Sequence, residues 1–168
     1  MTLDTLNAVS RTDFIDALAG IYEHSPWVAE QVEPQRPFAS VDALAHAMAN
    51  VVANAGEAAQ LRLIRAHPQL AGKAAIADEL TESSAREQRG AGLDQCSPEE
   101  FAQITRLNEA YQARFDFPFI IAVKGHDRAS ILAHMATRLR HDATTERNEA
   151  LRQIERIARF RLEILLET

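Results

Sequence analysis

The 168-residue chain is poor in cysteine and in positive charge. Its single cysteine, Cys96, cannot form a disulfide within the chain, and no zinc-type spacing of Cys and His surrounds it. We therefore expect a reducing compartment and, by default, a cytoplasmic location. Asp and Glu number 24 against 18 Lys and Arg, which gives a formal net charge of −6. This charge argues against nucleic acid or membrane as a partner, because both attract dense positive charge. A small-molecule or protein partner fits the composition better.

The chain also lacks long hydrophobic runs. Its longest apolar run, residues 117–123, is far too short to span a bilayer. The first ten residues lack the basic start and apolar stretch of a signal peptide. No repeat or low-complexity segment occurs. Since the length suits one ordinary domain with its own core, we predict a single domain over residues 1–168.

Helical periodicity of apolar residues dominates the sequence. One helix is predicted over residues 57–66, because a proline disfavours helical geometry at the residue before it. The candidate residues for starting the other helices are Ser10, Thr12, Ser40, Ser97, Asp127, Thr144 and Thr145. The predicted inner stripe of the helix that follows Ser97 is Phe101, Ile104, Leu107 and Tyr111.

Only residues 117–125, with the sequence FPFIIAVKG, are strand-like. One short strand cannot form a sheet. The fold class predicted is therefore all-α: a compact single-domain helical bundle with one short extended apolar connector. We expect this connector to lie exposed among the helices, with its backbone groups free because no sheet uses them.

Arg161 is predicted to face the core of the last helix. The residues three, four and seven positions before it and three and four after it are all apolar: Ala158, Ile157, Ile154, Ile164 and Leu165. A guanidinium keeps its proton, so a buried one requires an anion or several acceptors nearby. Glu87 is one candidate. The alternative is an internal ion pair, or a snorkelling side chain, with no part in chemistry.

Glu87 lies in a polar stretch, TESSAREQRGAG, which two glycines soon end. Such a composition indicates a short helix at the rim of a site. The spacing of Ser84 and Glu87 also fits a capping box, which would explain both residues locally. His67 precedes Pro68 at the expected end of a helix, where a rigid His-Pro step can hold the imidazole in one orientation. A histidine bonded only to local carbonyls is the alternative.

Two His-Asp pairs, His126-Asp127 and His141-Asp142, resemble loosely the ligands of metal-dependent phosphohydrolases. We do not expect a metal site, because Asp127 stands where a helix cap belongs and no histidines are spaced to ligate together. Neither of the two lysines, Lys73 and Lys124, lies in a pattern typical of a Schiff base, and no nucleotide-binding motif occurs. The sequence therefore predicts no cofactor.

Five segments together resemble the OHCU decarboxylase family, which acts on 2-oxo-4-hydroxy-4-carboxy-5-ureidoimidazoline in uric acid degradation. They are SPWVAE (25–30), HPQLAGKAA (67–75), SAREQRGAGLD (84–94), FPFIIAVKG (117–125) and IARFRL (157–162). Any one of these segments is a weak pattern. Their occurrence in this order over most of the chain is specific.

The resemblance implies a cofactor-independent decarboxylase of the all-α class, often dimeric, that produces (S)-allantoin. It implies that His67 is the catalytic proton carrier, and that Glu87 and Arg161 complete the catalytic set. It further implies substrate contacts from Pro68, Ser84 and Gln88. The same resemblance implies that the connector residues Phe119, Ile120, Ile121, Ala122 and Val123 present backbone groups to the ureido or ring amides of the substrate. The competing hypothesis is a non-catalytic helical interaction module, which would leave a core-facing arginine without a purpose.

Overall fold

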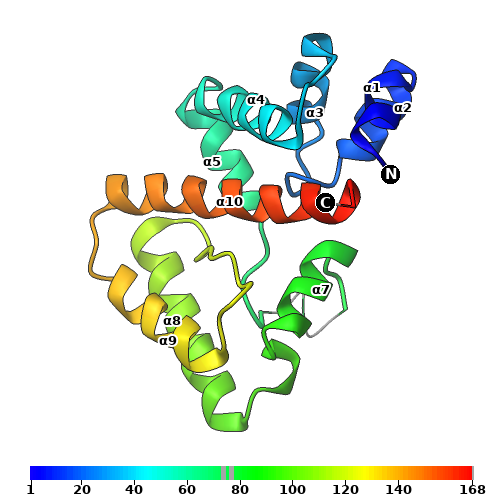
Figure 1. Ribbon diagram of the computed structural model, residues 1–168. Helices are drawn as coiled ribbons and strands as arrows, with labels where there is room; N and C mark the ends of the chain where they lie inside the picture. Colours follow the sequence, from blue (N-terminus) through cyan, green and yellow to red (C-terminus); the bar gives the residue numbers. More distant parts are fainter. Residues whose placement is uncertain (73–74, 76–77, 168) are drawn as a thin grey trace. The chain divides into compact units, whose positions relative to one another are not determined.

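A computed structural model describes residues 1–72, 75 and 78–167 (Figure 1). The described residues form helices and connecting segments without a β-strand, which confirms the predicted all-α class. By its contacts the chain divides into two compact units, Met1–Ala66 with Ile154–Thr168, and His67–Gln153. Each unit is described by itself, and a single domain stays a prediction. None of the helices in the described ranges is both long and apolar enough to cross a membrane.

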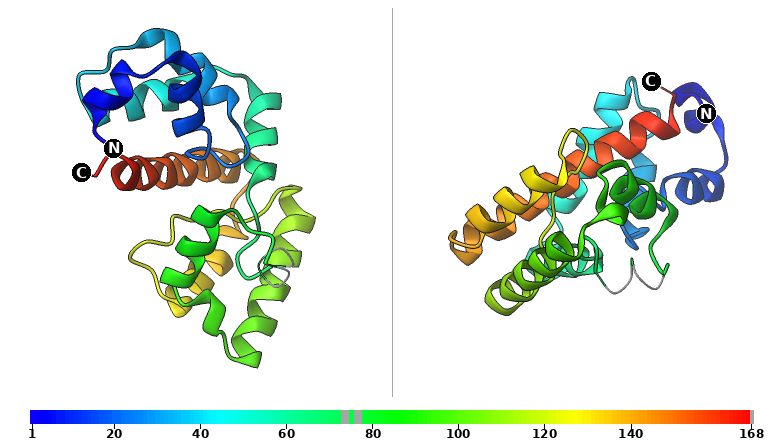
Figure 2. Two further views of the ribbon diagram at one scale, coloured as in Figure 1. Left: turned by 90° about the vertical axis from the view of Figure 1, so that its right-hand side faces the viewer. Right: turned by 90° about the horizontal axis from the view of Figure 1, so that it is seen from below.

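The first unit is built from short helices that pack on their neighbours in sequence (Figures 1 and 2). They are α1 (Leu3–Ala8), α2 (Arg11–Leu18), α3 (Trp27–Val32), η1 (Glu33–Gln35), α4 (Val41–Ala53), α5 (Glu57–Ala66) and the last part of α10 (Ala143–Leu165). Leu6, Phe14, Val28, Leu44 and Leu63 have no exposed surface and belong to its core. The burial of each such side chain stabilises the fold by about 1.5–3 kcal/mol.

The second unit contains α7 (Glu82–Gly90), η2 (Leu93–Gln95), α8 (Pro98–Phe115), α9 (Arg128–Arg138) and the first part of α10. Helices α8 and α9 pack together, and the connector leads from the end of α8 to the beginning of α9 (Figure 1). Tyr111 is the centre of an aromatic cluster, with its ring centroid 4.6 Å from that of Phe115, 5.9 Å from Phe117 and 5.4 Å from Phe119. This cluster ties the connector to α8.

Most of the predicted helix starts are confirmed. The side chains of Ser10, Ser40 and Asp127 accept a backbone N–H in the first turn of α2, α4 and α9. Thr12 lies inside α2 and is not its cap. Ser97 and Glu100 form a complete capping box, in which each side chain accepts the other residue's backbone N–H.

The predicted start of the last helix at Thr144 or Thr145 was wrong. Helix α10 begins at Ala143, and Oδ1 of Asp142 accepts the backbone N–H of Thr145 at 2.7 Å. This hydrogen bond also lowers the pKa of Asp142. Aspartate caps a helix at least as well as threonine, and here it comes first in the chain.

Two residues predicted to face inward are exposed. Phe101 is 37% exposed, because the buried stripe of α8 begins one turn later, at Ile104, and passes through Asn108 and Tyr111 to Phe115. Ile164, in the last turn of α10, is 60% exposed. Periodicity gives the direction of a stripe, but it does not say where packing against other helices stops.

Ser97, which caps α8, and Thr144, which does not cap α10, allow a matched test of the helix starts. Replacing Ser97 with Ala should lower the free energy of unfolding by about 1 kcal/mol, because the first turn of α8 loses an acceptor for a backbone N–H. Thr144→Ala, at a position that does not cap α10, should change it by less than about 0.5 kcal/mol. Urea denaturation measures both. Equal losses in the two variants would contradict the helix starts described here.

Candidate active site

His67 lies where the sequence predicted it. Helix α5 ends at Ala66, and His67 follows directly, with Pro68 after it. The histidine is buried, with 8% of its surface exposed. Since proline has no backbone N–H and a fixed φ, the chain leaves the helix here in one direction. The imidazole therefore sits on a well-defined turn of the chain.

Helix α7 carries Ser84, Glu87 and Gln88 on consecutive turns. The alternative of a capping box between Ser84 and Glu87 is excluded, because Thr81 is the N-cap and its side chain accepts the backbone N–H of Ser84 at 3.3 Å. Threonine is also a good cap, and it precedes the serine by three residues. Ser84 and Gln88 are buried, while Glu87 is half-buried. Ser84 and Glu87 therefore do not form a capping pair, and helix capping does not explain their presence.

Gln88 joins α7 to the segment that follows the His-Pro step. Its Oε1 accepts the backbone N–H of Ala71 at 2.9 Å, and its Nε2 donates to the carbonyl of Gln69 at 3.4 Å. From α8, the buried Asn108 donates to the carbonyl of Leu70 at 2.9 Å. Two amide side chains thus hold residues 69–71. Asn108 was not predicted, although a polar residue one turn after Ile104 on an apolar stripe is a local signal for a buried polar role.

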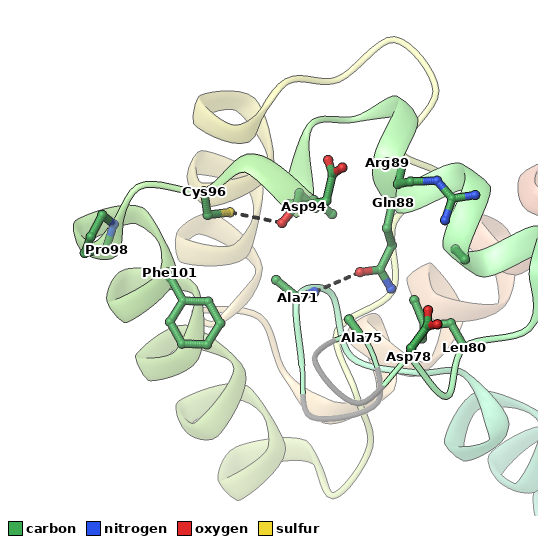
Figure 3. Close-up of a pocket in the computed structure, with 12 residues that line it drawn as sticks. Ala71, Ala75, Asp78, Leu80, Gln88, Arg89, Asp94, Cys96, Pro98 and Phe101 are labelled. Atoms are coloured by element: carbon green, nitrogen blue, oxygen red, sulfur yellow. Dashed lines mark hydrogen bonds between the residues drawn. The ribbon is translucent and has the colours of Figure 1, made fainter.

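A pocket of about 490 Å³ lies beside this segment in the second unit (Figure 3). Its walls include Ala71, Gln88, Cys96 and Phe101, which explains the exposure of Phe101 noted above. Cys96 Sγ donates to the carbonyl of Leu93 at 3.4 Å. Burial, and next the nearby Glu100 carboxylate, raise the pKa of the Cys96 thiol. The thiol therefore stays protonated at neutral pH, which does not suit a nucleophile.

The connector is buried rather than exposed, so this expectation was wrong. Residues 119–123 have between 1% and 8% of their surface exposed. Two of their backbone groups are also in use: Arg138 Nη1 donates to the carbonyl of Ile120 at 2.6 Å, and the N–H of Ala122 donates to Gln153 Oε1 at 3.0 Å. Side chains of α9 and α10 take the role that a neighbouring strand has in a sheet, and no local sequence pattern indicates this arrangement.

Arg138 belongs to a buried cluster that the sequence did not indicate. Its guanidinium contacts the fully buried carboxylate of Glu146, with Nε 3.0 Å from Oε2. The Tyr111 hydroxyl donates to the same carboxylate, and His141 Nδ1 lies 2.9 Å from Oε1. Burial, and next the hydrogen bond to Glu146, raise the pKa of Tyr111. The cluster connects α8, α9 and α10 and supports the connector.

The two His-Asp pairs have structural roles. Asp127 and Asp142 accept backbone N–H groups at the starts of α9 and α10. His141 bonds to Glu146, and His126 Nδ1 lies 2.7 Å from Ser130 Oγ. In the part of the chain that the structure describes, no three His, Cys, Asp or Glu side chains gather as a metal site requires. Lys73, one of the two lysines considered for a Schiff base, lies outside the described residues.

Arg161 is buried, with 5% of its surface exposed, as the sequence predicted. Its Nη1 lies 2.8 Å from Oε2 of Glu23, which is itself only 2% exposed. The same nitrogen approaches the carbonyls of Gly20 at 3.2 Å and Ile21 at 3.5 Å. An internal ion pair, left open by the sequence, is thus present. Glu23 was missed because it lies between α2 and α3, where no periodicity indicates which side chains turn inward.

Removing the Glu23 carboxylate alone should lower the free energy of unfolding more than removing both Glu23 and Arg161. We expect Glu23→Leu to lower the free energy of unfolding by about 3 kcal/mol, because it leaves the Arg161 charge in the interior without this ion pair. The double variant Glu23→Leu/Arg161→Leu should recover part of the loss. Denaturant titration of the wild type, both single variants and the double variant measures the coupling. A loss below about 0.5 kcal/mol in Glu23→Leu, the range of ordinary surface changes, would contradict the importance of the pair.

Comparisons with known proteins extend over nearly the whole chain. A model of the OHCU decarboxylase family matches residues 7–163. The 2-oxo-4-hydroxy-4-carboxy-5-ureidoimidazoline decarboxylase of Haloferax volcanii is 43% identical over 162 residues, which are 96% of this chain and 94% of that protein. A uric acid degradation bifunctional protein of Bacillus subtilis is 42% identical over 161 residues, 96% of this chain and 32% of that protein.

Two solved structures are also similar to this chain. The crystal structure of an (S)-allantoin synthase superposes with a TM-score of 0.79 at 28% identity, covering 100% of this chain and 55% of that one. An OHCU decarboxylase crystallised in the presence of (S)-allantoin shares the fold, with a TM-score of 0.73 at 20% identity over 90% of this chain and 99% of that chain. The family match together with the identity to the Haloferax volcanii relative shows that the chain belongs to the OHCU decarboxylase family.

Proposed function

We propose that this protein decarboxylates 2-oxo-4-hydroxy-4-carboxy-5-ureidoimidazoline to (S)-allantoin and CO2, the third step in the conversion of urate to allantoin. Membership of the family supports this reaction class. The structural observation that carries the proposal is the Gln88–Ala71 hydrogen bond. It connects the helix that bears Ser84 and Glu87 to the segment that follows His67 and Pro68, so that a proton carrier, a carboxylate and their neighbours belong to one framework.

The chemistry of this substrate is compatible with a reaction that needs no cofactor. The carboxylate leaves from a ring carbon next to a C=N bond. When the bond to the carboxylate breaks, its electron pair moves into the ring and is taken up by that C=N group, whose nitrogen gains a proton from water. A proton then adds to the ureido-bearing carbon while the substrate hydroxyl loses its own, which yields allantoin. The electron sink that a cofactor would supply is already in the substrate.

The protein's task is therefore to orient the substrate, stabilise the developing charge and deliver a proton to one face. In our proposal Arg161 binds the anionic part of the substrate, and the buried Glu23 holds the guanidinium in place for it. Glu87 fixes the His67 imidazole or the substrate hydroxyl. His67 moves the proton and so decides the stereochemistry. A carboxylate next to an imidazole favours its protonated form, which suits a donor at neutral pH.

The remaining contacts are proposed to come from Pro68, Ser84, Gln88 and residues 119–123. The Gln88 amide already bonds to Ala71 and Gln69. Its contribution to binding is therefore largely to hold this segment. We further propose that the enzyme works in the cytoplasm, where its one free cysteine stays reduced, and that it forms a homodimer. Light scattering after gel filtration measures the mass of the assembly and so tests the dimer.

The stereochemical course of the reaction tests the proposed function. Urate is converted in situ with uricase and hydroxyisourate hydrolase, the protein is added, and the circular dichroism of the allantoin is followed. We expect rapid formation of one enantiomer by the wild type. In His67→Ala and Glu87→Gln the rate should fall by about 10²–10⁴-fold, the usual contribution of acid-base groups.

Matched controls for these two variants are His46→Ala and Glu99→Gln, which change exposed side chains on α4 and α8. Both should keep the wild-type rate. Slow racemic product from the wild type would overturn the proposed function. Wild-type turnover in His67→Ala and Glu87→Gln would overturn only the assignment of these residues.

The kinetics of Arg161 variants distinguish a catalytic role of this arginine from a purely structural one. If it binds the substrate anion, Arg161→Leu should reduce kcat/KM by about tenfold or more, since hydrogen bonds to charged groups contribute about 1.5–3 kcal/mol. A purely structural arginine predicts unchanged kinetics in the double variant Glu23→Leu/Arg161→Leu, because replacing both members of a buried ion pair with apolar side chains leaves no buried charge unpaired. The two outcomes are compared in protein whose circular dichroism shows the native helical content.

A further inference from the structure

The turn that follows the His-Pro step is held at a single peptide group. The carbonyl of Leu70 and the N–H of Ala71 belong to one peptide bond, and in a trans peptide they point in opposite directions. Asn108 Nδ2 donates to this carbonyl at 2.9 Å, and Gln88 Oε1 accepts this N–H at 2.9 Å (Figure 3). Helices α8 and α7 thus hold the same peptide group from its two sides.

The backbone of this turn is strained and tightly closed. Ala71 has a φ of 48°, in the left-handed region that residues other than glycine occupy only at an energetic cost. A Cβ added to Gly72 would lie only 2.8 Å from the Cβ of Gln69, so the chain approaches itself too closely for a side chain at residue 72. Strained backbone persists where its surroundings impose it, and it is typical of functional sites. The φ of Ala71 is the rotation of residue 71 against the peptide group that the two amides hold, so these amides supply the constraint.

The stability of the fold does not explain an amide at position 108. Asn108 lies on the buried stripe of α8 and is 4% exposed. Its Oδ1 has no hydrogen-bond partner among the described residues. A buried acceptor without a partner opposes folding and offsets the gain from the bond to Leu70. Leucine would leave one buried oxygen unpaired, that of Leu70, where asparagine leaves its own. The benefit of the amide therefore lies in where it places the peptide group.

The position of His67 depends on this turn. His67 is the first residue of the second unit, which also contains Glu87 on α7. Within this unit the chain that follows His67 sets its position relative to Glu87. Pro68, with its fixed φ, links the histidine stiffly to that chain. A relaxed turn would therefore displace the imidazole from the carboxylate with which it is proposed to act.

We propose that Asn108 is a positioning residue of the active site, which together with Gln88 forms a clamp on the Leu70–Ala71 peptide. This peptide clamp keeps the His67 imidazole in the geometry for proton transfer. Asn108 acts through the backbone and makes no contact with the substrate. The inference rests on the proposed function, because it takes His67 as the proton carrier, and it adds a residue of α8 to that function. Loss of the clamp should therefore reduce kcat more than it weakens substrate binding.

The variant Asn108→Leu removes the donor of the clamp and keeps the approximate size of the side chain. We expect kcat for (S)-allantoin formation to fall by about 10–10²-fold, because a small displacement of a catalytic group has an effect of this size. KM should change by less than about threefold, since the groups that bind the substrate remain. Asn148→Leu, the same substitution at an exposed position of α10, is the matched control and should keep the wild-type kcat. A folded Asn108→Leu variant with the wild-type kcat would overturn the proposal, and so would one in which only KM changes.

Amide hydrogen exchange in ¹⁵N-labelled protein tests the clamp without an assay of activity. In the wild type the Ala71 amide should exchange slowly, because it is buried and Gln88 accepts its proton. In Asn108→Leu it should exchange faster by about tenfold or more, while the amide of Met135 in α9 keeps its rate. Equal protection of Ala71 in both proteins contradicts the clamp. Equal acceleration at Ala71 and Met135 indicates general destabilisation and contradicts it as well.

The outcomes separate this inference from the function on which it rests. A wild type that forms (S)-allantoin no faster than the uncatalysed reaction overturns the proposed function, and with it the catalytic role of the clamp. An active wild type with an unchanged kcat in Asn108→Leu overturns the inference alone. If Asn108→Leu does not fold, Asn108→Ala takes its place with the same expected fall in kcat. Rapid exchange of the Ala71 amide in the wild type would overturn the clamp whichever variant is used.

Discussion

A guanidinium cannot give up its charge in the interior of a protein, and much of this structure follows from that constraint. Each compact unit buries one arginine and supplies a buried carboxylate for it: Glu23 for Arg161 and Glu146 for Arg138. Such pairs add little net stability compared with apolar packing, because both charges lose their hydration. Their effect is to fix the orientation of the two arginine side chains. In one unit the arginine is fixed for its proposed contact with the substrate, and in the other it holds a stretch of backbone.

The second consequence concerns backbone without secondary structure. Residues 69–71 and 119–123 cross the interior of the second unit without a helix or a strand to bond their peptide groups. Buried peptide groups need partners, so side chains provide them. Gln88 and Asn108 hold the first segment, and Gln153 and Arg138 hold the second. The segments that carry or adjoin the proposed site are therefore positioned by side chains of helices, which are more rigid than loops.

Prediction from sequence succeeded where the signal is local. The caps at Ser10, Ser40, Ser97 and Asp127, the end of α5 before His67 and the burial of Arg161 all depend on residues within about two turns of helix. It failed where the partner is distant in the chain. Glu23 is 138 residues from Arg161, and Gln153 is 31 residues from Ala122. No periodicity relates such pairs, so the buried ion pairs and the anchored connector became visible only in three dimensions.

The choice of anchoring groups bears on the proposed chemistry. Decarboxylation moves negative charge from the carboxylate into the ring, and a fixed charge placed near the ring would favour or oppose that movement strongly in a dry interior. Three of the four side chains that hold the two irregular segments are neutral amides: Gln88, Asn108 and Gln153. An amide can donate and accept hydrogen bonds without adding a charge. The fourth, Arg138, has its charge balanced by Glu146. Backbone near the proposed site is thus held by supports that carry no net charge, which leaves the charges that act in the proposed reaction to His67, Glu87 and Arg161.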